Sequence, residues 1–234
     1  MSTLNPKIPK IKFTAASVAW SYGGITYFDV KASAGSVILI DWGDGRTTKH
    51  LFQNETEINF KHDYFPNHII PPYEREKFYV EICGSADCRI TGFRLSSGDM
   101  KAFDLDVTNC PELEELTYCW SDYSVNSHNL DLSCNTALRY LDCKENGLTS
   151  LNLANNTALE KLICSKNRLS HLSLAGNFAL KYIDCEYNAM KQLFICYAPQ
   201  LIEAAFEEGN NIDEATKAQI RELIAENIKN NTIN

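Results

Sequence analysis

Three stretches of the chain repeat one pattern at a constant spacing. They read LRYLDCKENGL (138–148), LEKLICSKNRL (159–169) and LKYIDCEYNAM (180–190), so their starts lie 21 residues apart. Each has apolar residues at its first, fourth and last positions, with a cysteine and an asparagine at fixed places between them. Self-similarity at a period of about 20 to 50 residues is typical of a stacked array of short units.

The pattern has a physical consequence that does not depend on its name. A coil of this length cannot bury its own leucines, so neighbouring coils must stack and share one core. Side chains alternate along a strand, which sends Leu162 and Cys164 inward and Lys161, Ile163 and Ser165 outward. The asparagine after each strand is expected to satisfy backbone groups of the following turn.

Degenerate copies extend the array on both sides, with starts at Ile90, Leu113 and Leu201. The full pattern, L-x-x-L-x-L-x-x-N-x-L, resembles the leucine-rich repeat over about residues 90–210. The resemblance implies a solenoid of about six coils with short parallel strands on one side. The second half of each coil, as in LTSLNLANNTAL (148–159) and LSHLSLAGNFAL (169–180), is expected to form the convex side.

The repeated cysteine is predicted to be a core residue. A zinc site would need four convergent ligands, and disulfides between stacked parallel strands would require backbone movement. Free cysteine is often buried and behaves as a small hydrophobe. Other apolar residues share its position in successive coils, which reads Leu95, Tyr118, Cys143, Cys164, Cys185 and Phe206.

A stacked array needs a cap at each end. The segment NNIDEATKAQIRELIAENIKNN (210–231) is predicted to be a helix that covers the C-terminal end. Asn211 followed by Glu214 resembles a capping box. The apolar side chains of one helical stripe are Ile220, Leu223, Ile224 and Ile228. The alternative is a helix that binds a partner, but its modest length and ordinary polar face favour the cap.

The first part of the chain differs in character. SYGGITYFDVKA, SVILIDWGDG and KFYVEICG read as β-strands with glycine-containing turns, and Asp44-Gly45 is a hairpin signal. The set DWGDG (41–45), HDY (62–64) and YVEI (79–82) resembles the PKD repeat. Over about residues 30–84, that resemblance implies an immunoglobulin-like β-sandwich that covers the N-terminal end of the solenoid.

The expected fold is therefore mainly β with some α. We expect an N-terminal extension over residues 1–12 and a PKD-like β-sandwich over 13–88. The leucine-rich repeat solenoid would follow over 89–209, with a C-terminal capping helix over 210–234.

No catalytic or metal-binding motif is present. None of the five histidines lies in a known catalytic or nucleotide-binding fingerprint, and no carboxylate spacing indicates glycoside hydrolysis. Asp41 and Asp44 fall short of the oxygen ligands that calcium takes, so a turn-stabilising role is expected. We predict no catalytic residues, no metal and no cofactor. Cys83 and Cys88 either form a small hairpin disulfide, if the protein is exported, or pack as reduced thiols.

Composition narrows the partner classes. A net charge of −8 argues against nucleic acid and anionic membranes. No apolar run approaches the roughly 20 residues of a membrane span. The start of the chain shows no export signal, so either the protein stays inside the cell or a leader has been removed. Both resemblances suggest the second alternative, a secreted or cell-surface bacterial protein. We expect the protein to act as a monomer.

The outward strand positions form the candidate binding surface, on the concave face of the predicted solenoid. Tyr140 and Tyr182 flank Lys161, and Ile163 is an apolar residue among polar ones. The alternatives are a merely solvated face, or tyrosine–lysine stacking that satisfies itself. The candidate ligand-binding residues are Arg94, Glu115, Thr117, Tyr140, Asp142, Lys144, Lys161, Ile163, Tyr182, Asp184 and Glu186.

An insertion over residues 119–130 interrupts one coil. Insertions in repeat proteins map to loops, often on a binding face, so Trp120 and Tyr123 are candidate anchors. The alternative is that they fold back over their own coil.

These features favour a non-enzymatic protein that binds a protein or peptide. A second hypothesis is a carbohydrate-binding accessory protein, because PKD-like modules accompany polysaccharide-degrading enzymes. A third is an enzyme whose site lies between sandwich and solenoid, which would require a deep pocket with a perturbed histidine or carboxylate.

Overall fold

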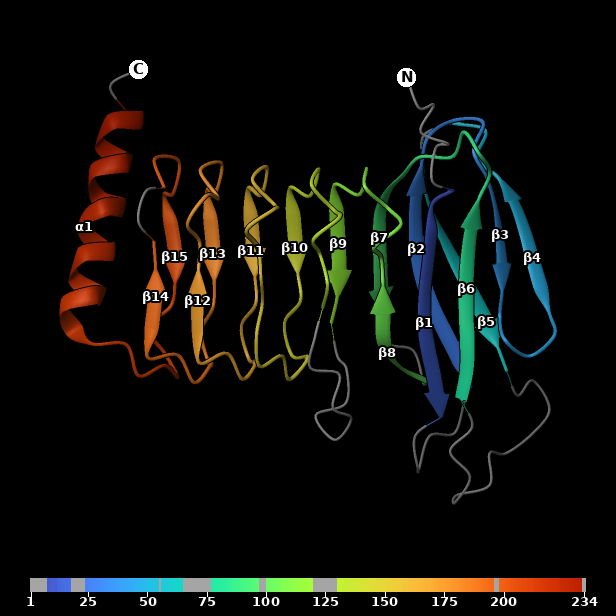
Figure 1. Ribbon diagram of the computed structural model, residues 1–234, viewed down its shortest axis with the longest axis horizontal. Coiled ribbons are helices and arrows are strands. Elements are labelled where there is room, and N and C mark those ends of the chain that lie inside the picture. Colours follow the sequence, from blue (N-terminus) through green and yellow to red (C-terminus); the bar gives the residue numbers. More distant parts are fainter. Residues whose placement is uncertain are drawn as a thin grey trace, which may run out of the picture.

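The structure, a computed structural model, describes residues 8–17, 24–54, 56–64, 77–96, 100–119, 130–195 and 198–232. The molecule is elongated. Long strands gather at the N-terminal end, short strands follow one another along the body, and a single helix, α1, lies at the opposite end (Figure 1). Within the described ranges, no helix combines the length and apolar character that crossing a bilayer requires.

One sheet is built entirely from the N-terminal part of the chain. It has five strands in the order β4-β3-β6-β1-β8. Their bounds are β1 Lys10–Ser17, β3 Val37–Asp41, β4 Thr47–Leu51, β6 Lys77–Gly84 and β8 Met100–Asp106. Since β1 begins at Lys10, the last residues of the stretch expected as an extension are part of a strand.

The second sheet has eight strands and runs the length of the molecule, in the order β15-β13-β11-β10-β9-β7-β2-β5. Strand β7 pairs in parallel with β9 and antiparallel with β2. The repeats and the N-terminal strands therefore share one continuous sheet. The bounds are β2 Ile25–Ala32, β5 Thr56–Asp63, β7 Ile90–Ser96, β9 Glu115–Tyr118, β10 Tyr140–Asp142, β11 Lys161–Ile163, β13 Tyr182–Asp184 and β15 Glu203–Ala205.

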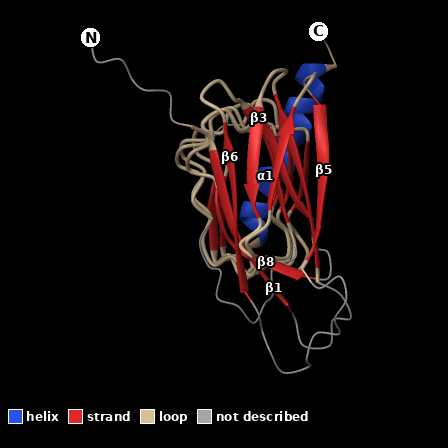
Figure 2. Cartoon of the chain, turned by 90° about the vertical axis from the view of Figure 1, so that its right-hand side faces the viewer, coloured by secondary structure: helices blue, strands red, loops and turns tan. Residues whose placement is uncertain are grey.

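At the N-terminal end the two sheets lie face to face, as the view along the molecule shows (Figure 2). Aromatic side chains from both layers fill the space between them. The ring of Phe28 on β2 lies 5.7 Å from that of Phe13 on β1 and 5.3 Å from that of Trp42, measured between centroids. Both phenylalanines and Trp42 are almost fully buried, so burial of aromatic surface holds these layers together.

The hairpin expected at Asp44-Gly45 is present. Strands β3 and β4 pair antiparallel across it. The Asp41 carboxylate accepts a hydrogen bond from the Gly43 N–H at 2.9 Å, and the Asp44 carboxylate accepts one from the Arg46 N–H at 3.0 Å. Both aspartates therefore stabilise the turn, as predicted. Gly43 has φ of 78°, and a Cβ there would lie 2.7 Å from the backbone of Tyr79, so only glycine fits.

The prediction of six coils was one too many. The solenoid makes about five turns, and the strands that carry them are β9, β10, β11, β13 and β15. The coil expected to start at Ile90 supplies β7 to the common sheet, but its second half is β8, which pairs with β1 in the other layer. The seven-residue strand β8 forms a long ladder of backbone pairing with β1. The convex strands of the coils have only three residues, so pairing there would have given β8 a shorter ladder.

Within the described ranges, the convex side has regular strand pairing only near the C-terminal end. Among the described residues, β12 (His171–Ser173) and β14 (Gln192–Phe194) form a two-stranded parallel sheet there. These strands lie in the second halves of successive coils, where the convex side was expected. Elsewhere the second halves consist of turns and extended segments.

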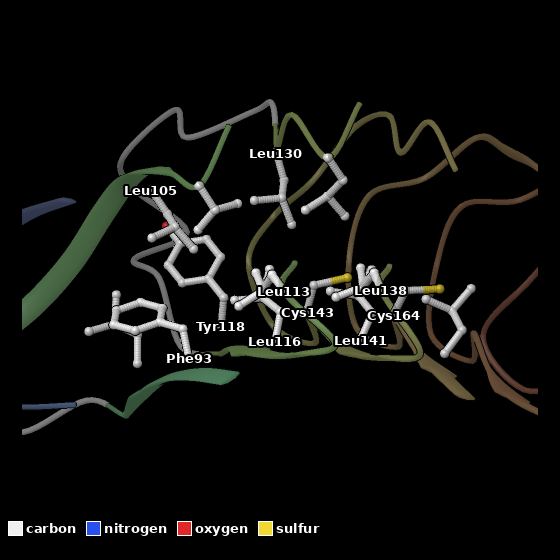
Figure 3. Packing of buried hydrophobic residues seen from close by; sticks show 14 of the residues in the cluster. Phe93, Leu105, Leu113, Leu116, Tyr118, Leu130, Leu138, Leu141, Cys143 and Cys164 are labelled. Carbon is white, nitrogen blue, oxygen red and sulfur yellow. The ribbon is translucent and has the colours of Figure 1, made fainter. Parts of the chain in front are cut away.

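The inward column is buried, as predicted. Figure 3 shows Tyr118, Cys143 and Cys164 following one another along the array, beside leucines of the strands. The residues of the column are each at most 3% exposed: Leu95, Tyr118, Cys143, Cys164, Cys185 and Phe206. The cysteines therefore act as small apolar fillers in a shared core.

An asparagine ladder joins the ends of the strands. The Nδ2 of Asn167 donates to the carbonyls of Cys143 and Cys164, at 3.0 and 2.9 Å. Its Oδ1 accepts from the backbone N–H groups of Asn146 and Leu148, at 3.1 and 3.0 Å. One side chain thus satisfies backbone groups of two adjacent coils, as expected for the asparagine of the repeat.

A second asparagine ladder lies at the turn between the convex half of one coil and the strand of the next. Its members are the buried Asn135, Asn156 and Asn177. The Nδ2 of Asn156 donates to the carbonyls of Leu132 and Asn135, at 3.1 and 2.9 Å. The role of these residues was missed from the sequence, although CNTAL, NNTAL and GNFAL recur every 21 residues.

Helix α1 (Glu214–Asn231) closes the C-terminal end. Its buried Asn227 donates to the carbonyls of Ala198 and Leu201, both at 2.8 Å, and so satisfies backbone groups of the last coil. Ile220 is buried and Ile224 packs against the core, but Ile228 is 45% exposed, so the apolar stripe is shorter than predicted.

The predicted cap residue of α1 was wrong. The N-cap is Asp213, whose carboxylate accepts from the Thr216 N–H at 2.9 Å. Asn211 lies two residues earlier, and its backbone N–H still bonds to the last coil, at the carbonyl of Met190. The helix therefore cannot begin until the chain has left the array.

Candidate functional site

The open face of the eight-stranded sheet carries the candidate site. Strand register aligns its outward side chains in rows that cross every strand. The first row reads Glu57, Lys31, Gly92, Glu115, Tyr140, Lys161, Tyr182 and Glu203, from β5 to β15. The second reads Asn59, Asp29, Arg94, Thr117, Asp142, Ile163, Asp184 and Ala205.

The structure places nine of the eleven predicted ligand-binding residues in these two rows. Lys144 and Glu186 lie just beyond the ends of β10 and β13. Most of these side chains are exposed or half-buried, but Asp142 is only 6% exposed. Trp120 and Tyr123 fall within residues 120–129, outside the described residues, so their role as anchors stays a prediction.

Part of this face was missed from the sequence. Asp29 and Lys31 on β2, with Glu57 and Asn59 on β5, continue the rows beyond the repeats. Their alternation with buried residues indicates a half-buried strand, but no motif shows which sheet the strand joins. The pairing of β2 with β7 brings them into line with the solenoid.

A lysine between two tyrosines occupies the middle of the first row. The Nζ of Lys161 lies 5.7 Å from the ring centroid of Tyr140 and 4.8 Å from that of Tyr182. Both distances are within the range of cation–π attraction. Burial, above all, raises the pKa of the Tyr140 hydroxyl, so this phenol stays neutral at physiological pH. The centre of the face is therefore an ordered, amphipathic surface.

Charges on the N-terminal half of the face pair with one another. Lys31 Nζ lies 3.2 Å from a carboxylate oxygen of Glu115. These side chains meet over Gly92, where a Cβ would lie 2.9 Å from that of Lys31. Arg94 lies 3.9 Å from the carboxylates of both Asp29 and Glu57. In this half of the face, these positive side chains are therefore paired with carboxylates of the same face.

A shallow depression of about 420 Å³ opens beside the first row. Arg94, Tyr140 and Lys161 line it from the face. Arg139 and Glu160 line it from the start of the strands, where Glu160 accepts hydrogen bonds from Arg139 and from Lys181. Charged side chains that line the depression already form hydrogen bonds with neighbouring residues. Its shallow shape suits contact with the surface of a partner more than enclosure of a small molecule.

Asp44 has the most displaced pKa among the carboxylates that the structure describes. Burial favours its protonated form, but hydrogen bonds from Arg46 and His62 outweigh burial and lower the pKa to about 2. His62 Nε2 lies 2.9 Å from the carboxylate, and the His62 ring stacks on Trp42 at 4.3 Å between centroids. Because Asp44 also binds the backbone of its turn, its environment is that of a structural carboxylate.

The cysteines are free thiols, as far as the described residues show. Burial raises the pKa of Cys143 and of Cys164 well above the usual range, so neither supplies a reactive thiolate. Cys83 and Cys88 are likewise unpaired, with Cys83 Sγ 3.2 Å from a Glu81 carboxylate oxygen. No group of three or more potential ligands is placed to hold a metal ion in the ranges that the structure covers.

The fold and this face define a leucine-rich-repeat-like solenoid. Neither the family models nor the curated proteins include a match to the chain. Among solved structures, the chain is similar to the functional domain of InlJ from Listeria monocytogenes, described as including a cysteine ladder. The two are 30% identical with a TM-score of 0.45, over 49% of this chain and 24% of that one. The similarity thus spans about a quarter of the InlJ chain.

Proposed function

We propose that this chain is a non-enzymatic binding protein that recognises a protein or peptide through the open face of its solenoid. The observation that carries the proposal is the ordered row of Tyr140, Lys161 and Tyr182 beside the half-buried Ile163. Tyrosine is enriched in recognition surfaces because it offers a large area with few rotamers to fix. Extended sheets of this kind suit partners that contact several coils at once.

The N-terminal strands are part of this proposal. We assign them to a PKD-like β-sandwich over about residues 13–88, followed by the solenoid over 89–209 and the cap over 210–234. The stacked aromatic core supports the assignment. So does the Asp44–His62 contact between the two motifs of the PKD-like pattern. In this assignment the sandwich covers the first coil and widens the face. Both resemblances imply a role at a bacterial cell surface.

A carbohydrate-binding accessory role is the second candidate. The half-exposed rings of Tyr140 and Tyr182 lie among carboxylates and lysines, and sugars bind to such mixtures of aromatic and polar groups. Both rings are already contacted by Lys161, however, which favours the protein or peptide ligand.

A paired experiment separates the two candidates. Wild-type protein and the Tyr140→Ala/Tyr182→Ala variant are tested against a glycan array and, by cross-linking, against extracellular proteins of the source organism. Phe194→Ala is the control, because Phe194 is an exposed aromatic residue on β14, outside the face. We expect protein capture that the double variant loses and the control keeps. Glycan binding with the same pattern would support the alternative, and capture that survives in the double variant would refute the face.

A further inference from the structure

The first row of the open face is symmetric about its lysine. From β9 to β15 it reads Glu115, Tyr140, Lys161, Tyr182 and Glu203. The two glutamates occupy equivalent positions on either side of the same aromatic and lysine set. Their surroundings can therefore be compared directly.

Glu115 shows how a glutamate in this row is satisfied. Lys31 reaches it from β2, with Nζ 3.2 Å from the carboxylate. The lysine does not come from the neighbouring strand, because the residue there is Gly92. It crosses that position, which only glycine leaves open, since a Cβ would lie 2.9 Å from Lys31. The N-terminal end of the set thus terminates in an ion pair.

Glu203 has no such cation in the part of the chain that the structure describes. Among the residues that the structure describes, no lysine or arginine lies within 4.0 Å of its carboxylate, nor of those of Asp184 and Glu186. The nearby helix does not compensate them, because Arg221 of α1 pairs with Glu207 and Glu214. Burial first, and then the charges of Asp184, Glu203 and Glu186, raise the pKa of the Tyr182 hydroxyl. In the strand register Glu203 lies beside Tyr182, and Asp184 follows two residues later on the same side of β13.

The Glu203 side chain is exposed to solvent. In the second row the residue of β15 is Ala205, the smallest side chain at that position on the repeats. Tyr182 already contacts one ammonium group, that of Lys161, from the β11 side. An aromatic ring bordered by carboxylates attracts a cation through both cation–π attraction and charge-assisted hydrogen bonds.

We propose that the β13–β15 end of the open face docks a lysine- or arginine-bearing segment of the partner, which places its cation against Tyr182 and Glu203. The inference rests on the proposed function and specifies the chemistry of the ligand. The partner's cation would pair with Glu203 as the Lys31 ammonium group pairs with Glu115 at the other end of the row. Charge complementarity of this kind gives specificity and raises the rate of association more than it raises affinity.

The test uses a fluorescein-labelled peptide that carries four lysines separated by glycine and serine, with the same peptide acetylated on every lysine as its control. Binding to the full chain is measured by fluorescence anisotropy at low salt and at physiological salt. The Asp184→Asn/Glu203→Gln variant neutralises two of the three carboxylates that act on Tyr182 and leaves Glu186 in place. The matched variant is Glu81→Gln/Asp131→Asn, which changes net charge equally but acts on carboxylates outside the eight-stranded sheet, on β6 and on an exposed segment before β10.

We expect the lysine peptide to bind and the acetylated peptide not to bind. Loss of two exposed ion pairs is worth about tenfold in affinity, so Asp184→Asn/Glu203→Gln is expected to bind about tenfold more weakly. The matched variant should stay within about twofold of wild type. Equal binding of both peptides would overturn the inference, because binding would then not depend on the lysine charges. Equal weakening by both variants would overturn it as well, because binding would then reflect only the net charge of −8. Circular dichroism verifies that both variants fold.

The outcome is separable from that of the proposed function. If Tyr140→Ala/Tyr182→Ala abolishes protein capture while Asp184→Asn/Glu203→Gln leaves it intact, the face binds a partner without this cation and only the inference fails. If the tyrosine variant captures protein normally, the proposed function fails as well.

Discussion

Replacing Asn167 with alanine tests whether the asparagine ladder holds adjacent coils together. The Asn167 side chain is 7% exposed and joins two coils. Its Nδ2 donates to the carbonyls of Cys143 and Cys164. Its Oδ1 accepts from the N–H groups of Asn146 and Leu148. Alanine can replace none of these bonds.

The expected loss follows from these contacts. A buried hydrogen bond contributes about 1 kcal/mol net to stability, so removing four such bonds costs about 4 kcal/mol. For a chain of this size, m in urea is about 3 kcal/mol per molar. The unfolding midpoint should therefore fall by about 1.3 M.

The matched control is Asn155→Ala. Asn155 is exposed and makes one hydrogen bond, from Nδ2 to the Ser133 carbonyl at 3.0 Å. Its loss should cost under about 1 kcal/mol, because water can replace an exposed partner. Urea unfolding followed by far-ultraviolet circular dichroism compares both variants with wild type. Hydrogen exchange of the Asn146 and Leu148 amides gives a local readout, and we expect their protection to fall in Asn167→Ala alone.

A role of the ladder in holding the coils together is refuted if Asn167→Ala and Asn155→Ala lose the same stability to within about 1 kcal/mol. Unchanged protection of the Asn146 and Leu148 amides in Asn167→Ala would refute it independently, because those amides would then not depend on the ladder.

Two further predictions concern thiols and pH. In native protein the exposed Cys134 should react with a thiol reagent. The thiols of Cys143, Cys164 and Cys185 should react only after unfolding, since all three residues are 0% exposed. Rapid labelling of these three, or zinc released on denaturation, would contradict their role as packing residues. Asp44→Asn should lower stability by up to about 2 kcal/mol at neutral pH. Because folding lowers the pKa of Asp44 from 3.8 to about 2, its contribution is complete above pH 3.8 and is lost as pH falls toward 2. Urea midpoints at several pH values check this, and a difference from wild type that persists unchanged to pH 2 would count against it.

The repeat period explains why the array was predictable. A strict 21-residue spacing fixes both the inward and the outward residues of each strand. It therefore places Tyr140, Lys161 and Tyr182 side by side, as the register shows. The burial of Cys164 followed from the same reasoning, since Tyr118 and Phe206 occupy its position in other coils.

The junction with the N-terminal layers was not predictable from local sequence. KAFDLD (101–106) alternates in the same way whether it completes a coil or joins a second sheet. Strand β8 pairs with the edge of β1, which lies about 90 residues earlier in the chain; Ala102, for example, lies opposite Ala15. The continuation of the face onto β2 and β5 has the same origin, because antiparallel pairing of distant strands leaves no periodic signal.

The start of α1 shows a smaller ambiguity. Asn211 and Asp213 are both residue types that cap helices, and each has a polar residue three positions later. The array itself decides between them, since the Asn211 N–H bonds to the Met190 carbonyl.

The equivalence of interior coils makes the length of the face adjustable in whole steps. Deletion of residues 159–179 would bring Cys143 next to Cys185, and Asn146 next to Asn188, which are the same neighbours in kind as before. The N-terminal strands and helix α1 would each keep their contacts with the adjoining coil. The distance between them would shorten by a single strand spacing, about 4.8 Å. Gain or loss of one repeat unit therefore changes the length of the face by one strand spacing, which lets related proteins match partners of different size.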